Sequence, residues 1–190
     1  KNIYFEFADE NRLNEFISNL NLSQPQSRYL RNNTSRSTKI DLSNLIFDMR
    51  RIKSKSEVSL IRHAAKISAK AHINIMKSCK SGLKEYEVEA DFIKHCMSER
   101  CEQAYPAIVA SGKNACILHY TKNNAILTSN SLLLVDAAAE YDNYASDITR
   151  TIPISGKFNE FQKKIYEIVL KAQTMAIKAC KPGKLSLIHI

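Results

Sequence analysis

A short apolar run at residues 132–135 ends in a carboxylate, Asp136. A second carboxylate, Asp147, lies inside an alternating apolar and polar segment at residues 144–154. The residues between them are turn-like, so the two segments are predicted to form an antiparallel hairpin. A carboxylate at the end of a buried strand is costly to desolvate unless another group compensates its charge. The two aspartates therefore restrict the chain to folds in which a positive charge, a metal ion or hydrogen-bond donors lie next to this hairpin.

Two registers of the hairpin are open. With Tyr141 and Asp142 as a two-residue loop, Asp136 lies directly opposite Asp147, with Cβ atoms about 4.5–5.5 Å apart. A loop shifted by one residue leaves the two aspartates diagonal neighbours on the same face. Two divalent ions about 3.5–4 Å apart would fit this gap, and oxygen ligands favour magnesium or manganese over a thiolate zinc site. The alternative is an aspartate pair satisfied by Arg150 or by backbone amides.

His119 is the second candidate for chemistry, because it follows a predicted turn at residues 111–114. An imidazole there can donate to a substrate carbonyl or to an oxyanion. The alternative is a packed or surface histidine. His72 falls on an apolar helix face and is expected to be a core residue, whereas His63 and His95 are expected to be partly exposed.

Three amphipathic helices are predicted around the hairpin. The first starts at a capping box, Ser54 with Glu57, and continues to residue 79. The second covers residues 84–101, and the third covers residues 159–180. The order helix, helix, strands, helix predicts an α+β domain with helices packed on one face of an antiparallel sheet.

All three helices have a predicted stripe, which in the first helix consists of Val58, Ile61, Ala65, Ser68, His72, Ile75 and Cys79. In the second helix it consists of Tyr86, Ala90, Ile93 and Met97. In the third it consists of Phe161, Ile165, Ile168, Ala172, Met175 and Ala179.

Composition excludes several classes of protein. The chain has 190 residues, of which 44% are hydrophobic and 25% are charged, which excludes global disorder. No uncharged apolar run approaches the ~20 residues of a membrane span. Five cysteines without a CxxC spacing favour a reducing compartment. The net charge is +9, but the basic residues between Arg28 and Lys80 lack an aromatic platform, so nucleic-acid binding is not favoured.

The N-terminal part has a different character. A short strand is predicted at residues 4–7 and a short helix at 11–20, followed by a polar linker at 21–39 and a strand at 42–49. The first residue is Lys1, and we expect that the chain is cut from a longer one. We therefore interpret residues 1–45 as the end of an N-terminal domain and its linker.

The hairpin carries a family resemblance. Residues 133–141 and 144–151 resemble the central signature of the aminopeptidase P (Xaa-Pro aminopeptidase) family of metallopeptidases, which have the pita-bread fold. Residues 105–115 and 118–120 resemble the segment that precedes this signature. The resemblance covers about residues 45–184. It implies that residues 46–184 are the first half of a pita-bread catalytic domain. It also implies that the partners of the third helix's stripe lie mostly beyond Gly183, so the large side chains of that stripe are expected to be partly exposed.

The resemblance also implies roles for single residues. Asp136 would bind one of two metal ions and Asp147 would bridge both, and manganese is the ion expected. His119 would be the catalytic residue that contacts the substrate around the scissile bond. The family's other ligands, one histidine and two glutamates, come later than Ile190, so this chain alone is expected to be inactive. Ala138 replaces a glycine of many members, which should narrow the site without destroying it.

The implied protein is a cytoplasmic enzyme, a homo-oligomer when complete, that releases the N-terminal residue from peptides with proline at the second position. Two alternatives are a prolidase-type dipeptidase and a non-enzymatic pita-bread protein that binds nucleic acid or another protein. The combination of Asp136, Asp147 and His119 opposes the non-enzymatic alternative. Residues 185–190 resemble the translation of a transposon-end sequencing adaptor, so we expect a non-native tail, and His189 is not considered as a ligand.

Overall fold

A computed structural model describes residues 2–5 and 38–184 of the chain. The chain divides into two compact units, residues 1–58 and 59–190. The helix predicted at residues 11–20, nearly all of the linker and the tail at 185–190 lie outside the described residues. The expected domain boundary near residue 45 stays a prediction.

In the first unit, β1 (Asn2–Phe5) pairs in parallel with β2 (Thr38–Asp41). Helix α3 (Ser43–Arg51) follows. The predicted strand at residues 42–49 is therefore wrong, because that segment is helical. Its apolar residues recur three and four positions apart, which is the period of a helix rather than of a strand: Leu42, Leu45, Ile46 and Met49.

The three predicted helices are confirmed as α4 (Lys55–Ser78), α5 (Glu85–Ser98) and α6 (Glu160–Ala179). At the start of α4 the Ser54 amide donates to Glu57 Oε2 (2.6 Å), and the Glu57 amide donates to Ser54 Oγ (3.3 Å). These reciprocal bonds satisfy amides that have no partner in the first turn of a helix. The capping box that the sequence predicted is therefore present.

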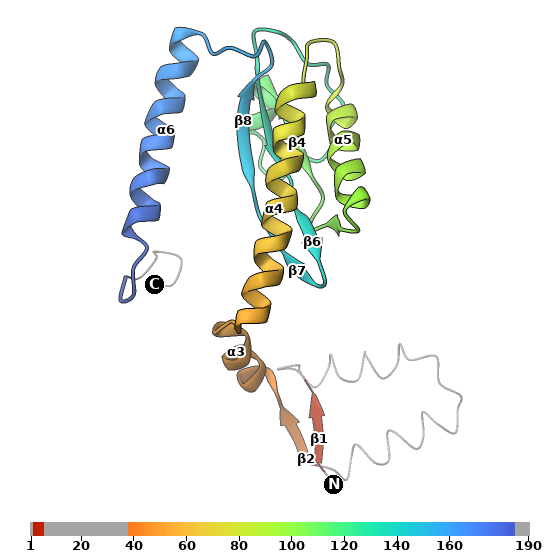
Figure 1. The fold of residues 1–190 in the computed structure, drawn as a ribbon, viewed down its shortest axis with the longest axis vertical. Coiled ribbons are helices and arrows are strands. Elements are labelled where there is room, and N and C mark those ends of the chain that lie inside the picture. The colour runs from red at the N-terminus through yellow and green to blue at the C-terminus, as the bar shows by residue number, and fades with distance from the viewer. Residues whose placement is uncertain (1, 6–37, 185–190) are drawn as a thin grey trace, which may run out of the picture. The chain divides into compact units, whose positions relative to one another are not determined.

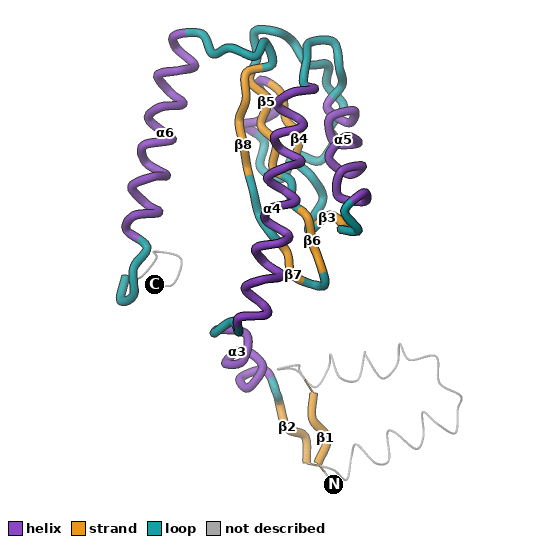
Figure 2. The backbone as a smooth tube through the Cα atoms, viewed as in Figure 1, coloured by secondary structure: helices purple, strands orange, loops and turns teal. Residues whose placement is uncertain are grey.

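The strands of the second unit form two antiparallel three-stranded sheets, and Figure 2 colours them orange. One sheet has the order β3 (Glu102–Gln103), β6 (Ala139–Tyr141) and β7 (Tyr144–Ala145). The other has the order β4 (Ile108–Ser111), β5 (Leu132–Asp136) and β8 (Thr149–Pro153). One chain segment therefore runs through both sheets, from β5 into β6 and back through β7 into β8.

Helices α4 and α5 pack on these strands and form the core, as the α+β prediction requires (Figure 1). Its members include Ile67, Ala71 and Ile75 of α4, Phe92 of α5, and Leu133 and Val135 of β5. His72 is 3% exposed, with its ring 5.6 Å from that of Phe92. The prediction that His72 is a core histidine is confirmed.

The predicted apolar face of α5 is wrong. Tyr86 and Met97 are 47% and 70% exposed. The buried face carries a different set of residues: Glu85, Val88, Phe92 and Cys96. Both sets have helical spacing, so the period alone could not choose between them.

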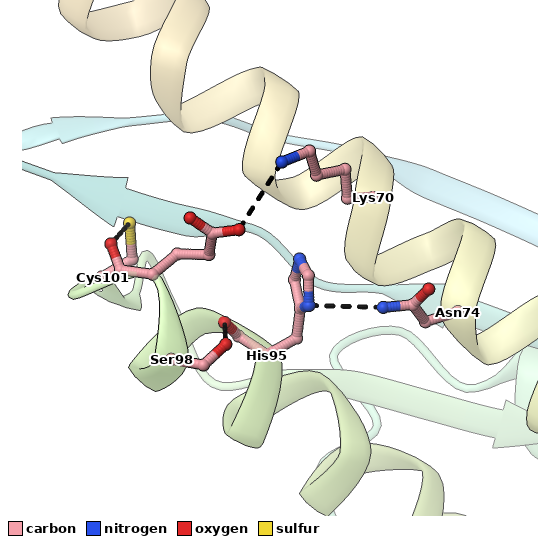
Figure 3. A network of polar contacts seen from close by, with 6 residues as sticks. Lys70, Asn74, His95, Ser98 and Cys101 are labelled. Carbon is pink, nitrogen blue, oxygen red and sulfur yellow. Dashed lines mark hydrogen bonds and ion pairs between the residues drawn. The ribbon is translucent and has the colours of Figure 1, made fainter.

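Polar contacts at the surface join α4 to α5, and Figure 3 shows them from close by. Lys70 Nζ lies 3.5 Å from Glu99 Oε1, and Asn74 Nδ2 lies 3.3 Å from His95 Nδ1. The ion pair is partly exposed and contributes little to stability. His95 is half-buried and His63 is exposed, which agrees with the prediction for both.

Helix α6 has no buried residue. Its stripe is open, with Phe161 74%, Ile165 48%, Ile168 64% and Met175 61% exposed. The predicted exposure of this stripe is confirmed. The start of the helix is fixed by a cap: the Gln162 amide donates to Asn159 Oδ1 (2.8 Å), and the Asn159 amide donates to Gln162 Oε1 (3.0 Å). Within residues 2–5 and 38–184, no helix has the length and apolarity that crossing a membrane requires.

Candidate active site

The hairpin has the second of the two registers left open by the sequence. Asp136 pairs with Thr149 in the β5–β8 ladder, and Tyr141 pairs with Tyr144 in the β6–β7 ladder. The loop is therefore Asp142 and Asn143, and direct opposition of Asp136 and Asp147 is wrong. Because Asp147 precedes Thr149 by two residues, the two aspartates are diagonal neighbours.

The turn explains this register. Asp142 and Asn143 have φ angles of +48° and +65°, as both central residues of a type I′ hairpin turn require. Asp and Asn tolerate this left-handed conformation, whereas a bulky residue such as Tyr141 rarely adopts it. Turn chemistry was therefore the signal that could have selected the register from sequence.

The two carboxylates converge on one hydroxyl. Tyr105 Oη lies 2.7 Å from Asp136 Oδ1 and 3.1 Å from Asp147 Oδ1. Burial, and next the hydrogen bond to Asp136, raise the pKa of Tyr105 far above its usual range. The phenol thus keeps its proton and acts as a donor to the acids. Sequence reasoning missed Tyr105, although strand pairing places Ile108 opposite Asp136, which brings the segment before β4 to this end of the sheet.

His119 lies in the same pocket as the two aspartates. The pocket has a volume of about 420 Å³ and is lined by Tyr105, Pro106, Ile108, His119, Thr121, Asp136 and Asp147. His119 itself is exposed, with φ at +53°. A left-handed residue other than glycine is uncommon and occurs often at functional sites. The structure thus brings together all three residues that the sequence singled out, while their individual roles stay predictions.

The donor set fits part of a divalent metal site. Asp136 and Asp147 offer hard oxygen ligands, which suit magnesium or manganese. In the part of the chain that the structure describes, no ion pair joins Arg150 to either acid, and the Arg150 guanidinium donates to the Thr149 carbonyl instead. No third histidine, cysteine or acid among the described residues completes a metal cluster. The two aspartates alone are therefore an incomplete ligand set.

A buried carboxylate holds the loop that carries His119. Glu85, at the start of α5, is 0% exposed. Its Oε1 accepts from the Ser111 amide (2.7 Å), Ser111 Oγ (2.8 Å) and Asn114 Nδ2 (3.1 Å), and its Oε2 accepts from Tyr120 Oη (2.7 Å) and the Ala125 amide (3.0 Å). The donors lie on both sides of His119, so Glu85 fixes the loop at both ends.

The same donors decide the charge of Glu85. Burial by itself would raise the pKa of this carboxyl, but the bonds from Tyr120, Ser111 and Ala125 outweigh burial and lower it. Glu85 is therefore ionised near neutral pH. Sequence reasoning missed this residue, because its donors come from segments far along the chain.

Comparison with known proteins agrees with the geometry. Residues 59–189 match metallopeptidase family M24. The Xaa-Pro aminopeptidase of Haemophilus influenzae is 44% identical over 146 residues, which are 76% of this chain and 34% of that protein. The Xaa-Pro aminopeptidase of Escherichia coli is 38% identical over 172 residues, which are 89% of this chain and 38% of that protein. The chain thus spans little more than a third of these relatives.

Solved structures match nearly the whole chain. Proline aminopeptidase P II from Yersinia pestis has a TM-score of 0.82 at 33% identity, over 96% of this chain and 42% of that chain. Pseudomonas aeruginosa aminopeptidase PepP has a TM-score of 0.83 at 36% identity, over 96% of this chain and 41% of that chain. Zinc-substituted Escherichia coli aminopeptidase P in complex with product has a TM-score of 0.81.

These matches confirm the predicted fold class, which is α+β and covers part of the pita-bread fold. They also agree with the resemblance that the hairpin carries, and the family match extends over most of the chain. The chain belongs to metallopeptidase family M24.

Proposed function

We propose that this chain is part of a metal-dependent aminopeptidase that releases the N-terminal residue from peptides with proline at the second position. The relatives named above are Xaa-Pro aminopeptidases, and the chain spans only part of them. The observation that carries the proposal is the convergence of Asp136 and Asp147 on Tyr105, in the pocket that also contains His119.

Asp136 and Asp147 would hold the divalent ions, for which we propose manganese. When bound, such ions lower the pKa of water and polarise a carbonyl. Tyr105 keeps its proton and donates to the carboxylates, which limits how far the two acids can turn away from each other. His119 is the exposed imidazole of the pocket, where it can donate to the carbonyl oxygen of a bound peptide. Further ligands would come from the later part of the complete protein.

The wider properties of the complete protein also belong to this proposal. We place it in the cytoplasm and expect a homo-oligomer that acts on peptides and not on nucleic acid. The 190-residue chain alone should be inactive, because two carboxylates cannot hold a catalytic pair of ions. The prolidase alternative would cleave dipeptides with a related site, so the assay below uses substrates of two lengths.

The test uses the complete protein, stripped of metal with EDTA and then supplied with Mn²⁺. It is assayed on a tripeptide with proline at the second position, on the same tripeptide with alanine there, and on an Xaa-Pro dipeptide. The proposal predicts Mn²⁺-dependent cleavage of the proline tripeptide above all. Preference for the dipeptide would favour prolidase. No cleavage in the presence of bound Mn²⁺ would contradict the proposal.

A further inference from the structure

Between β5 and β6 on one side and β7 and β8 on the other, each residue pair of the hairpin that carries the two aspartates makes one backbone hydrogen bond instead of two. The Ala137 amide donates to the Ile148 carbonyl (3.2 Å), and the Ser146 amide donates to the Ala139 carbonyl (3.1 Å). In a regular antiparallel ladder each such pair exchanges two bonds. Here the second group of each pair, the Ala137 carbonyl and the Ala139 amide, contacts α4 instead.

Two buried side chains of α4 supply these contacts. His72 Nε2 lies 2.9 Å from the Ala137 carbonyl, which can only accept, so the ring nitrogen donates. The Ala139 amide donates to Ser68 Oγ (2.8 Å). His72 and Ser68 are 3% and 0% exposed. They lie one turn apart on α4, so a single helix face reaches both points.

The hydroxyls of Ser68 and Ser146 form what we term the serine bridge. Their Oγ atoms are 2.8 Å apart, and Ser146 Oγ donates to the Ala139 carbonyl (3.0 Å). Each hydroxyl has one hydrogen, so Ser68 must donate to Ser146. The result is a closed ring: Ala139 amide to Ser68, Ser68 to Ser146, and Ser146 to Ala139 carbonyl.

The serine bridge adjoins one of the two acids directly. Ser146 is 8% exposed and immediately precedes Asp147. Ile148, on the other side of Asp147, is held by its bond to Ala137. The backbone of Asp147 is thus fixed on both sides, while Asp136 is fixed separately in the β5–β8 ladder. The position of the Asp147 carboxylate relative to that of Asp136 therefore depends on this ring of hydrogen bonds.

We infer that Ser68 and Ser146 are positioning residues, which set Asp147 relative to Asp136 for divalent metal binding. The inference rests on the proposed function, since it takes the two acids as ligands. Removal of a group that orients a metal ligand without itself contacting the metal typically lowers metal affinity or activity about 10–100-fold. Loss of the serine bridge should therefore weaken metal binding by about this factor.

The experiment measures Mn²⁺ binding to the complete metal-free protein by titration calorimetry, without substrate. Ser68→Ala leaves the buried Ala139 amide without its acceptor, so this variant can fail to fold. Ser146→Ala is milder, because the Ala139 carbonyl keeps the Ser146 amide as a donor. The Ser68 hydroxyl loses its acceptor but can turn to a carbonyl in the preceding turn of its own helix. We expect the Ser146→Ala protein to fold and to bind Mn²⁺ about 10–100-fold more weakly than the parent.

Ser78→Ala is the matched control. Ser78 is an exposed serine on α4, the helix of Ser68, and its hydroxyl donates to Asp91 (3.2 Å). It should bind Mn²⁺ like the parent. A merely structural bridge would lower the melting temperature of the Ser146→Ala protein and leave its Mn²⁺ affinity unchanged well below that temperature, which would overturn the inference. Weakened Mn²⁺ binding in a protein that cleaves no Xaa-Pro peptide would support the inference and overturn the proposed function. A parent that binds no Mn²⁺ would overturn both.

Discussion

Asp136 and Asp147 share one hydrogen-bond donor, the hydroxyl of Tyr105, which lies 2.7 Å from an oxygen of the first and 3.1 Å from an oxygen of the second. A hydroxyl has a single hydrogen, so it offsets only part of the repulsion between two acids. The remaining negative charge faces a pocket that also contains His119. This relationship is the structural reason for placing divalent ions there.

Asp147→Asn should leave the metal-free fold intact. The substitution keeps the size of the side chain and removes one of two like charges, and the amide oxygen can still accept from Tyr105. Relief of repulsion should offset any loss, so the free energy of unfolding should change by less than about 1 kcal/mol or rise. Urea unfolding of the metal-free complete protein checks this. A loss of several kcal/mol would mean that the carboxylate of Asp147 is structural.

Glu85→Gln should destabilise the protein by about 3 kcal/mol. Each carboxylate oxygen of Glu85 accepts at least two hydrogen bonds. The side-chain NH₂ of a glutamine can only donate, so in either position it would lie against groups that also donate. Urea unfolding near pH 7 measures the loss. Glu87→Gln, on the exposed side of the same helix, is a control for the loss of one negative charge.

The contribution of Glu85 should also depend on pH. Its pKa in the folded protein is lowered from the ordinary value of 4.5. A group of this kind stabilises the fold above its unfolded pKa and loses that contribution as the pH falls towards its folded pKa. The stability difference between the parent and Glu85→Gln should therefore be constant near neutrality and shrink below about pH 4.5. A difference that grows on acidification would contradict the assigned charge.

His119→Ala should lower kcat for an Xaa-Pro tripeptide by about 10²–10³-fold, which is the usual effect of removing one donor to a developing oxyanion. Mn²⁺ affinity should not change, because the role proposed for His119 is contact with the substrate and not with the ions. Steady-state kinetics and calorimetry measure the two effects. His95→Ala, at the contact between α4 and α5, should leave both unchanged. Loss of Mn²⁺ binding in His119→Ala would instead make His119 a ligand.

The stripe of α6 should behave differently in the isolated chain and in the complete protein. Ile168 is 64% exposed here, so Ile168→Lys should leave the melting temperature of the 190-residue chain unchanged and reduce its binding of a hydrophobic dye. If the later chain covers the stripe, the same substitution buries a charge and should cost about 3 kcal/mol or more in the complete protein. Equal effects in both proteins would contradict the reading of this chain as half of a domain.

Local signals in the sequence were enough to predict the long elements. The cap at Ser54 and Glu57 and the cap at Asn159 and Gln162 define where α4 and α6 begin, because capping bonds are made within one turn. The apolar run before Asp136 predicted β5 for a similar reason. These features depend on neighbours along the chain, so no tertiary contact is needed to recognise them.

The buried face of α5 and the role of Tyr105 could not be predicted, because both depend on contacts between segments far apart in the chain. Helix α5 has two stripes of the same period, and the buried one includes Glu85, whose donors lie beyond residue 110. Pattern reasoning assigns a glutamate to solvent and so selected the face of Tyr86 and Met97. The hairpin register was left open, although the turn residues Asp142 and Asn143, which take the left-handed positions, could have selected it. Tyr105 was missed because its partners, Asp136 and Asp147, lie more than 30 positions later in the chain.

The most direct test of the account is the number of Mn²⁺ ions bound per chain of the complete protein, measured by calorimetry on the parent, Asp136→Asn and Asp147→Asn. We predict two ions for the parent, the loss of at least one in Asp136→Asn, and weakened binding of both in Asp147→Asn. Equal stoichiometry and affinity in all three proteins would contradict the assignment of these aspartates as metal ligands.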